Sequence, residues 1–484
     1  MQILQDCCTG CAYCLLSCPA EAIVSRNGRC SIEQDVCTLC GQCFWACPSR
    51  CIEDGGQAVP KAKCGSEYDI VVIGAGIGGL MAAAALSRSG LRVAVFEQLS
   101  FIGGRYTEIE HKGYLVTTGA WTPPGPRSNI GRFLRKVGAD VRWITLRDTG
   151  GDLFHIRFPD GRHYRSVDEF LSRRELLGYA RALAQGRRKA PSDVDALSYV
   201  RGFVGNPDLL AVVDANIATA SGLRASEVPA SEFVHITLTM RDVGQDFGYP
   251  AGGPRAIIEA LAKVVEENGG RIFTRARVGR ILVENGKARG IELAGGVIVK
   301  AEKVIHNGGV RRFIQLVGPD NLPADYLSRL QSLKGVECGA LVLGTREPLY
   351  RGTPMLITPG FNRVVGMFEP TFFDPGVAPS NRHMYDVFFL VRSEDRAQEL
   401  ELALSDLGRM FPGFDEVTEM MVPMFFVGAW PGTETGQYIG QVGEQRLDPR
   451  TPVEDLYLVG MDVKGSGVAG DLVPVGVERL LNCL

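Results

Sequence analysis

Residues 69–79 read DIVVIGAGIGG and decide the fold of this chain. The apolar run before Gly74 predicts a buried strand, and the glycines that follow obey the pattern Gly-x-Gly-x-x-Gly. Gly74 permits a tight turn, and Gly76 lets the backbone approach a pyrophosphate at the positive end of a helix. Gly79 allows that helix to pack closely on the strand. The stretch therefore predicts a dinucleotide site.

The residues after this turn complete a strand–helix–strand unit. An alanine-rich helix is predicted over residues 80–89, and a second strand over residues 92–96. Glu97 follows that strand, 23 residues after Gly74, where an acid can accept hydrogen bonds from a ribose diol. The alternative interpretation of Glu97 is a solvated strand end. This unit alone leaves NAD and FAD both open.

Cysteine is concentrated near the N-terminus, where twelve of the 14 cysteines lie between Cys7 and Cys64. Two runs there share the spacing C-x2-C-x2-C-x3-C-P. Three thiolates at this spacing can bind one face of an iron–sulfur cube, while the fourth reaches a second cube. Zinc ribbons, in contrast, present two separated C-x2-C pairs, and a disulfide framework is typical of secreted chains. We predict two [4Fe–4S] clusters, one bound by Cys8, Cys11, Cys14 and Cys47 and the other by Cys18, Cys37, Cys40 and Cys43.

On these two runs, residues 1–55 resemble the bacterial two-cluster ferredoxins. The resemblance implies a small α+β domain with two clusters close enough to exchange electrons. Cys7 lies next to Cys8 and could compete with it as a ligand. We expect the surplus cysteines to be small buried apolar residues. They are Cys30, Cys51 and Cys64.

Glycine-rich stretches recur downstream. Gly103-Gly104-Arg105 follows the first unit, and residues 456–462 (LYLVGMD) lead into residues 465–470 (GSGVAG). Three further stretches are residues 249–254 (YPAGGP), 269–274 (GGRIFT) and 304–308 (VIHNG). On these stretches, residues 67–484 resemble the FAD-dependent phytoene desaturase and amine oxidase superfamily. The resemblance implies that FAD is bound by one domain built from three separated segments.

The resemblance also implies which residues hold FAD. Gly74, Gly76 and Gly79 would bind the pyrophosphate, and Glu97 the adenosine ribose. The other implied positions are Gly104, Arg105 along the phosphates or flavin edge, Val278 near the adenine, Asp462 at the pyrophosphate–ribityl region, and Val468.

This sequence departs from the superfamily at two places in the implied site. Thr117 stands where relatives often carry an acid, and Met461 comes between Gly460 and Asp462. Arg105 could also be a surface arginine, and Asp462 a helix N-cap.

The fold class that follows is α/β. We expect a Rossmann-type FAD-binding domain with a discontinuous mixed α+β substrate domain, preceded by the small α+β ferredoxin domain. The expected boundaries are 1–55 for the ferredoxin domain, 56–66 for a linker, 67–110, 250–310 and 450–484 for the FAD-binding domain, and 111–249 and 311–449 for the substrate domain.

The substrate domain is expected to lie over the flavin and to be rich in apolar side chains. Candidates for a tunnel lining are Phe233, Phe247, Met355, Phe361, Met367, Phe368, Phe372, Phe373, Met424, Phe425 and Phe426, although ordinary core packing is the expectation for any single one. The six histidines form no catalytic motif, and the catalytic residues stay unknown. Hydride chemistry at a flavin needs mainly a positioned substrate.

The composition of the chain limits the kinds of partner that it can be expected to bind. The 484 residues are 45% hydrophobic and 22% charged with a formal charge of -3, which gives no indication of nucleic-acid or anionic-membrane binding. The sequence contains no apolar run of the ~20 residues that span a bilayer, and a cytoplasmic protein is expected. No second glycine-rich unit for NAD(P)H is found, so the clusters are expected to serve as the electron port. Oxygen-sensitive clusters also favour an anaerobic organism.

The leading hypothesis is an iron–sulfur flavoenzyme that reduces or desaturates carbon–carbon bonds of a small apolar, isoprenoid-like substrate. Ferredoxin or another redox protein would be its electron donor or acceptor. The first alternative is an electron-transfer subunit that links ferredoxin or NADH to a larger redox complex. A weaker alternative is an amine oxidase-like dehydrogenase. The substrate, the direction of turnover and the oligomeric state remain open.

Overall fold

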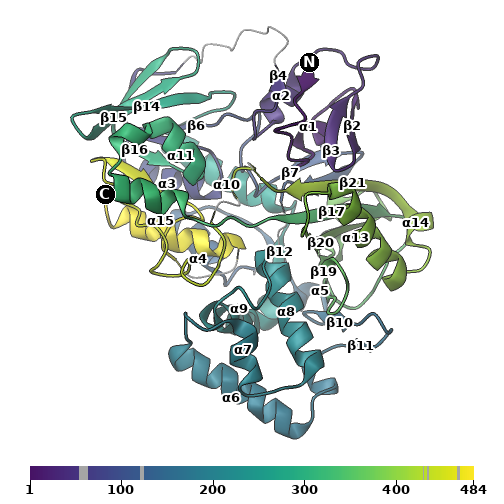
Figure 1. Cartoon of the computed structure of the whole chain (residues 1–484). Coiled ribbons are helices and arrows are strands. Elements are labelled where there is room, and N and C mark those ends of the chain that lie inside the picture. Colours follow the sequence, from purple (N-terminus) through teal and green to yellow (C-terminus); the bar gives the residue numbers. More distant parts are fainter. Residues whose placement is uncertain (54–63, 120–124, 429, 433–434, 466–468) are drawn as a thin grey trace.

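The computed structural model describes residues 1–484 except residues 54–63, 120–124, 429, 433–434 and 466–468. A mixed sheet carries the strands on either side of the glycine turn (Figure 1). In spatial order its strands are β13 (Arg271–Phe273), β6 (Val93–Phe96), β5 (Glu67–Ile73), β16 (Ile298–His306), β15 (Lys287–Leu293) and β14 (Val278–Glu284). The strands from β13 to β16 run parallel, and β22 (Leu456–Leu458) pairs in parallel with the end of β16.

Helices cover both faces of this sheet, because the strands are apolar on both faces. Ile70 and Val72 of β5 face a core built with α3 (Ile77–Arg88), and Val71 and Ile73 face the opposite core. On the first face α3 packs against α10 (Pro254–Glu267), α4 (Asn129–Val137) and α15 (Val473–Leu481). On the second face lie α11 (Val310–Val317) and α12 (Ala324–Gln331).

A second sheet lies beside the first and is rich in buried aromatic residues (Figure 1). Its order is β11 (His163–Tyr164), β10 (His155–Arg157), β18 (Met355–Ile357), β19 (Val364–Phe368), β20 (His383–Leu390), β17 (Cys338–Thr345) and β21 (Thr418–Phe426). The helices α13 (Arg396–Met410) and α8 (Pro207–Ser221) both pack against β19. A short sheet of β9 (Trp143–Thr145) and β12 (Gly248–Pro250) links the two halves.

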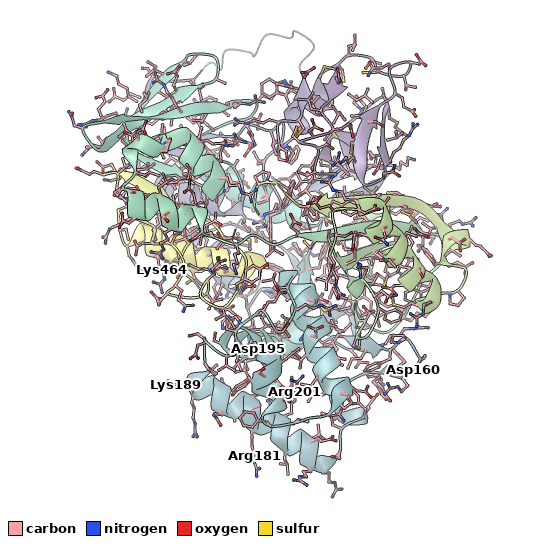
Figure 2. The ribbon with its side chains drawn as sticks, viewed as in Figure 1. Asp160, Arg181, Lys189, Asp195, Arg201 and Lys464 are labelled. Atoms are coloured by element: carbon pink, nitrogen blue, oxygen red, sulfur yellow. A yellow bond between two sulfur atoms is a disulfide. The ribbon has the colours of Figure 1, made fainter. Side chains whose placement is uncertain are left out.

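A helical lobe projects from the end of the second sheet (Figure 1). It contains α6 (Arg173–Lys189), α7 (Ala196–Arg201), α8 and α9 (Ala230–Val243), which share one apolar core. Figure 2 shows Arg181 and Lys189 of α6 pointing away from that core. Within the described ranges, none of the helices combines the length and apolar character that a membrane span requires.

Residues 1–53, which we call the N-terminal module, form a small α+β unit docked on both sheets (Figure 1). Its elements are β1 (Gln2–Ile3), α1 (Tyr13–Leu16), β2 (Ile23–Arg26), β3 (Arg29–Ile32), α2 (Gln42–Ala46) and β4 (Ile52–Glu53). β1 pairs with β4, and β2 with β3. Tyr13 and Leu16 belong to the same apolar core as α3, and Phe425 of β21 donates its N–H to the carbonyl of Gly10 at 3.1 Å.

The strands of the first sheet come from the segments 67–110, 250–310 and 450–484. Most strands of the second sheet come from residues 338–426. Two packing features cross the expected boundaries. The hairpin of β7 (Glu108–His111) and β8 (Tyr114–Thr117) spans the boundary at residue 110. The helices α4, α11 and α12 cover the first sheet although they lie in segments expected to form the substrate domain.

A buried carboxyl links this hairpin to the second sheet. Asp386 of β20 is only 1% exposed and accepts a hydrogen bond from the Thr117 hydroxyl at 3.0 Å. Burial raises the pKa of Asp386 to about 7, with the Thr117 bond acting in the opposite direction. Burial also raises the pKa of Glu108, and the nearby charge of Asp386 adds to that effect. Between pH 4 and pH 7, the carboxyl group of Asp386 is therefore protonated in the folded chain but ionised in the unfolded chain.

We expect Asp386→Asn to remove part of the pH dependence of stability. The folded state binds one extra proton between pH 4 and pH 7, so the unfolding free energy of the native protein falls as pH rises through this window, by roughly 3 kcal/mol. Asparagine cannot ionise, so the variant gains stability over the native protein as pH rises. Urea unfolding between pH 4 and pH 8 measures this difference, with exposed Asp193→Asn as control. Parallel pH profiles for the Asp386 variant and the native protein would count against this account.

Candidate functional site

A central cavity of about 310 Å³ lies at the carboxyl ends of β5, β6 and β16. This is the edge of a parallel sheet where α/β folds bind their ligands, and ligand pockets commonly have volumes of about 300–1,000 Å³. The cavity continues between the two sheets to α8, β17, β20 and β21. It is lined by Gly74, Gly76, Glu97, Gly104, Arg105, Val278 and Asp462 among the residues expected to bind the cofactor.

The glycine turn has little or no space for a side chain at three of its positions. Gly74 has a φ of +99°, and Gly76 is the N-cap of α3. A Cβ on Gly76 would lie 2.8 Å from the amide nitrogen of Asn307. Gly79 does not line the cavity; a Cβ there would lie 2.1 Å from the carbonyl oxygen of Gly74, so this glycine lets α3 pack under the turn. The described glycines thus form a narrow backbone cradle at the start of a helix, suited to a pyrophosphate.

Asn307 is a residue of the cavity that sequence reasoning missed as a site residue. It lines the cavity directly after β16, and its side-chain amide donates to the carbonyl of Gly74 at 3.5 Å. A Cβ on Gly78 or Gly460 would also collide with its side-chain oxygen, at 2.7 and 2.8 Å. Two signals in the sequence could have identified it: its place at the carboxyl end of a predicted strand, and its membership of the resembling stretch 304–308.

Glu97 is a buried acid, not a solvated strand end. It is 5% exposed, and its carboxylate accepts hydrogen bonds from the backbone N–H groups of Ala75 and Leu99, both at 2.8 Å. Burial raises the pKa of Glu97, while these backbone donors oppose the rise. The two bonds hold the carboxyl group at the cavity wall, where its remaining lone pairs can accept hydrogen bonds from a ligand.

We expect Glu97→Ala to weaken the binding of an adenine dinucleotide by about 10- to 100-fold. The variant loses the ribose contact and leaves two buried N–H groups without their acceptor, which costs about 1–3 kcal/mol per group. Glu97→Gln keeps an acceptor oxygen and should lose less affinity. Fluorescence titration of the apoprotein with FAD tests this order, with exposed Glu67→Ala of β5 as the matched control. The expected role fails if both Glu97 variants bind FAD as the control does.

Arg105 and Met461 meet on another wall of the cavity. The guanidinium of Arg105 lies 2.7 Å from the Met461 sulfur and 5.8 Å from the centre of the Trp430 ring. Met461 therefore does not displace the neighbouring acid from the site: Asp462 also lines the cavity and accepts a hydrogen bond from the Thr435 hydroxyl at 2.6 Å. Val278 is buried at the start of β14 and also lines the cavity. Val468 lies outside the described residues.

The part of the cavity that faces the second sheet is largely apolar. Val336, Val365, Phe388, Phe389 and Phe426 line it, together with α8 residues 218–221. Of the eleven residues considered for a tunnel lining, Phe426 alone among the described cavity residues reaches this wall. The other ten pack in the apolar cores, as ordinary core packing predicts.

The histidines contribute no base to the cavity as described. His306 ends β16, is 1% exposed, and its Nε2 lies 2.9 Å from the carbonyl oxygen of Gly309. Burial lowers its pKa to about 4, so it is neutral near pH 7. His155 and His383 pair with Asp152 and Glu369 at 2.9 and 3.0 Å, away from the cavity lining.

Four cysteines of the N-terminal module, Cys8, Cys11, Cys14 and Cys47, come together as the first cysteine set. Burial and then the neighbouring thiol of Cys47 raise the pKa of Cys11, and burial and then Cys8 raise that of Cys47. The largest influence on Cys14, a hydrogen bond with Cys30, lowers its pKa, but burial and the other three thiols outweigh it. The set is therefore drawn from both sequence runs.

The second cysteine set is Cys18, Cys37, Cys40 and Cys43, which surround a small cavity at the module surface. Burial raises the pKa of Cys43 to about 11, and the other three thiols of the set add to the rise. None of the eight cysteines in the two sets, all described, forms a disulfide. Within the described ranges, no group of three or more His, Cys, Asp or Glu side chains is arranged to hold a single metal ion.

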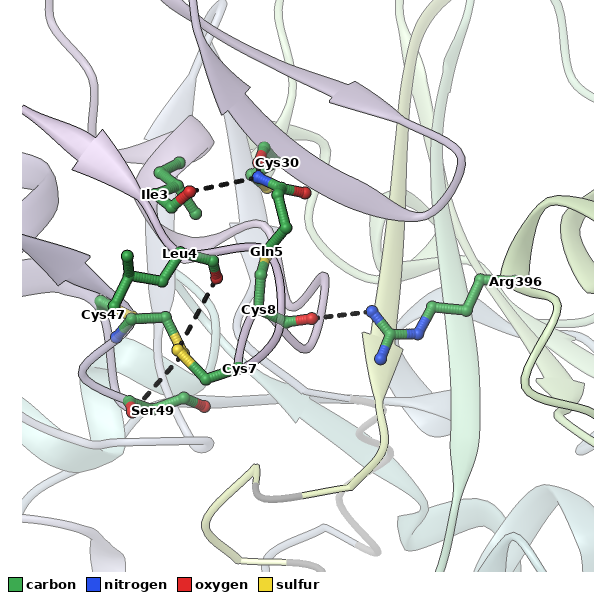
Figure 3. The surroundings of a disulfide bond; sticks show 10 residues. Ile3, Leu4, Gln5, Cys7, Cys8, Cys30, Cys47, Ser49 and Arg396 are labelled. Atoms are coloured by element: carbon green, nitrogen blue, oxygen red, sulfur yellow. Dashed lines mark hydrogen bonds between the residues drawn. A yellow bond between two sulfur atoms is a disulfide. The ribbon is translucent and has the colours of Figure 1, made fainter.

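The cysteines outside the two sets differ in part from the sequence-based expectation. Cys7 and Cys51 form a disulfide, so Cys7 does not compete with Cys8, and Cys51 is not a free apolar residue (Figure 3). Cys30 is buried as expected, but it also hydrogen-bonds to Cys8 and Cys14. Cys64 is half-buried, after the undescribed residues 54–63.

Comparison with known proteins identifies the cavity-bearing part of the chain. Residues 77–471 match the family of flavin containing amine oxidoreductases. The crystal structure of an oxidoreductase from Methanosarcina mazei is 31% identical, covers 85% of this chain and 99% of its own, and superposes with a TM-score of 0.77. An uncharacterised protein of Methanocaldococcus jannaschii is 28% identical over 85% of this chain and 98% of its own length.

A third relative has a named reaction. The zeta-carotene-forming phytoene desaturase of Myxococcus xanthus is 29% identical over 57% of this chain and 60% of its own length. The expected α/β class and the family resemblance are thereby confirmed for this part of the chain. The chain belongs to the flavin containing amine oxidoreductase family and is an FAD-dependent oxidoreductase of the superfamily that includes phytoene desaturases and amine oxidases.

Proposed function

We propose that this protein is an iron–sulfur flavoprotein that passes electrons between two [4Fe–4S] clusters and FAD, and that it reduces or desaturates carbon–carbon bonds of a small apolar, isoprenoid-like substrate. One observation carries the proposal. Tyr13 and Pro48, which adjoin Cys14 and Cys47 of the first cysteine set, line the same central cavity as the glycine turn and Glu97. The module expected to carry clusters therefore supplies a wall of the FAD cavity.

The donor chemistry of the two cysteine sets supports iron–sulfur clusters. Each set offers four thiols with no disulfide among them, and each combines three cysteines of one run with the fourth of the other. In a cube each thiolate binds a different iron, so the four sulfurs stay further apart than around one ion. Two clusters would pass single electrons, and FAD supplies hydride chemistry when bound.

The residues of the cavity divide into those that would hold FAD and those that would shape a substrate site. The glycine turn, Asn307 and Glu97 would hold the dinucleotide, and Asp462 and Arg105 its central part. The apolar wall of β19, β20 and β21 would exclude water and orient the substrate. These are the roles that hydride chemistry asks of a protein, because the reacting groups belong to the flavin and the substrate.

The substrate class rests on this wall and on the relatives. Val365, Phe388, Phe389 and Phe426 present apolar surface to the cavity. The named relative is a phytoene desaturase that forms zeta-carotene, as its name states. A small apolar alkene is therefore the first substrate to test.

A second candidate function is an electron-transfer subunit without an organic substrate. Val36 and Leu39, beside Cys37 and Cys40 of the second cysteine set, are 46% and 58% exposed. Exposed apolar side chains next to a cluster suit the docking of a redox protein. Both candidate functions use this surface, and the difference between them is the fate of the electrons.

The test is an anaerobic titration of the iron- and flavin-loaded protein, followed at flavin and cluster wavelengths. Reduced ferredoxin should reduce both chromophores, whereas NADH should reduce neither. Subsequent reoxidation of the flavin by an apolar alkene would support the enzyme. Reduction by NADH would favour the electron-transfer subunit and would contradict the interpretation of the clusters as the electron port.

A further inference from the structure

The N-terminal module contributes a charged side chain to the central cavity. Arg50, near the end of the module, lines the cavity together with Gly76 and Glu97. Its backbone has a φ of +60°, which is an uncommon conformation for a side-chain-bearing residue. Arg50 lies three residues after Cys47, the last member of the first cysteine set.

A pair of side-chain bonds holds Arg50 against the first sheet. Its Nε donates to the side-chain oxygen of Gln98 at 2.9 Å, and the Gln98 amide donates back to the carbonyl of Pro48 at 3.3 Å. Gln98 directly follows Glu97 at the carboxyl end of β6. The guanidinium is therefore held against Gln98, the residue that follows the acid expected to bind the adenosine ribose.

The terminal nitrogens of Arg50 are available to a ligand. They make no hydrogen bond or ion pair to any residue that the structure describes, although Arg50 is half-buried at the cavity wall. Burial, and then the charges of Arg312 and Arg277, lower the pKa of Arg50 to about 9. Arg312 lines the same cavity. A bound anion would offset both the burial and the repulsion.

A phosphate is the anion that fits this position. A guanidinium presents parallel N–H donors that match phosphate oxygens, and the glycine cradle faces the same cavity with backbone N–H groups. We infer that Arg50, supplied by the N-terminal module, binds a phosphate group of the adenine dinucleotide in the central cavity. The module is then part of the cofactor site as well as the expected electron port. This inference rests on the proposed function in one respect, that the cavity holds FAD.

The experiment compares Arg50→Ala, Arg50→Lys and the matched control Arg26→Ala in the full-length, iron-reconstituted protein. Arg26 lies in the same module, but its side chain is 71% exposed and pairs with Glu33 at the surface. Flavin is removed, and the apoproteins are titrated with FAD, ADP and adenosine by fluorescence and calorimetry. Iron content and circular dichroism check that each variant keeps the module folded.

Arg50→Ala should weaken FAD and ADP by roughly 10- to 100-fold, and leave adenosine, which has no phosphate, unchanged. Arg50→Lys should retain part of the affinity, and Arg26→Ala all of it. Equal affinity of Arg50→Ala and Arg26→Ala for ADP overturns the inference, as does an equal loss for adenosine. If Arg50→Ala does not fold, an Arg50→Lys variant that is folded and binds ADP as tightly as the native protein overturns it. Failure of the native protein to bind FAD would instead overturn the proposed function.

Discussion

Replacing Gly79 with alanine should leave the protein without FAD and should lower its free energy of unfolding by about 3 kcal/mol or more. The added Cβ would lie 2.1 Å from the carbonyl oxygen of Gly74. That contact is to backbone, so it cannot be relieved by a side-chain rotation. Either α3 moves away from β5, which opens a buried core, or the glycine turn changes its conformation.

The stability change would be measured by urea unfolding and the cofactor content by flavin absorbance. Gly205→Ala is the matched control, because a Cβ there meets nothing within 4 Å. Gly76→Ala separates the loss of FAD from the loss of stability. Its Cβ would meet only the side-chain amide of Asn307, at 2.8 Å. That variant should lose FAD affinity and keep most of its stability. Normal FAD content in the Gly79 variant would show that the turn tolerates a side chain and would refute this account of the cradle.

The second large effect concerns the cysteine sets. Cys11→Ser should reduce the iron bound per chain by half or more, because Cys11 is a buried member of the first cysteine set. Cys40→Ser, in the second set, should do the same. Both variants should also slow flavin reduction by reduced ferredoxin by about 100-fold or more, since the expected route from the surface to the cavity is interrupted.

Cys7→Ser is the matched control, because Cys7 is bonded to Cys51 and belongs to neither set. It should retain the full iron content. Iron and acid-labile sulfide analysis after anaerobic reconstitution measures all three variants. The assignment of ligands is wrong if Cys7→Ser loses iron while Cys11→Ser keeps it.

The sequence-based prediction was most accurate for site residues that lie close together along the chain. Gly74, Gly76 and Glu97 belong to one strand–helix–strand unit, and the structure places them at one edge of the first sheet. Arg105 and Asp462 come from distant segments, so only the family resemblance could bring them to the same cavity. Their convergence follows from the pairing of β22 with β16, which no local pattern contains.

Other features could not be predicted, because they depend on tertiary packing. Asn307 lies in a stretch that carries the family resemblance, residues 304–308, but no motif assigns its side chain to the site. Arg50 enters the cavity only because the N-terminal module docks against Gln98 and β21. The aromatic residues of the second sheet are alike in composition, and only their positions in the fold separate Phe426 at the cavity from Phe368 in the core.

The contacts of the module explain why its position matters. Arg396 of α13 donates to the carbonyl of Cys8 at 2.8 Å (Figure 3). Ser100 donates its N–H to the carbonyl of Trp45 at 2.9 Å. These bonds anchor the module to α13, which packs on the second sheet, and to the loop after β6 of the first sheet. Tyr13 and Pro48, next to Cys14 and Cys47 of the first cysteine set, line the cavity, and Cys40 of the second set is exposed.

The most direct test of the central claim is the cofactor content of the native chain after anaerobic purification and reconstitution. Iron, acid-labile sulfide and flavin would be measured on the same sample. The account predicts about eight iron atoms, about eight sulfides and about one FAD per chain. FAD without iron, or with zinc in place of iron and sulfide, would contradict it.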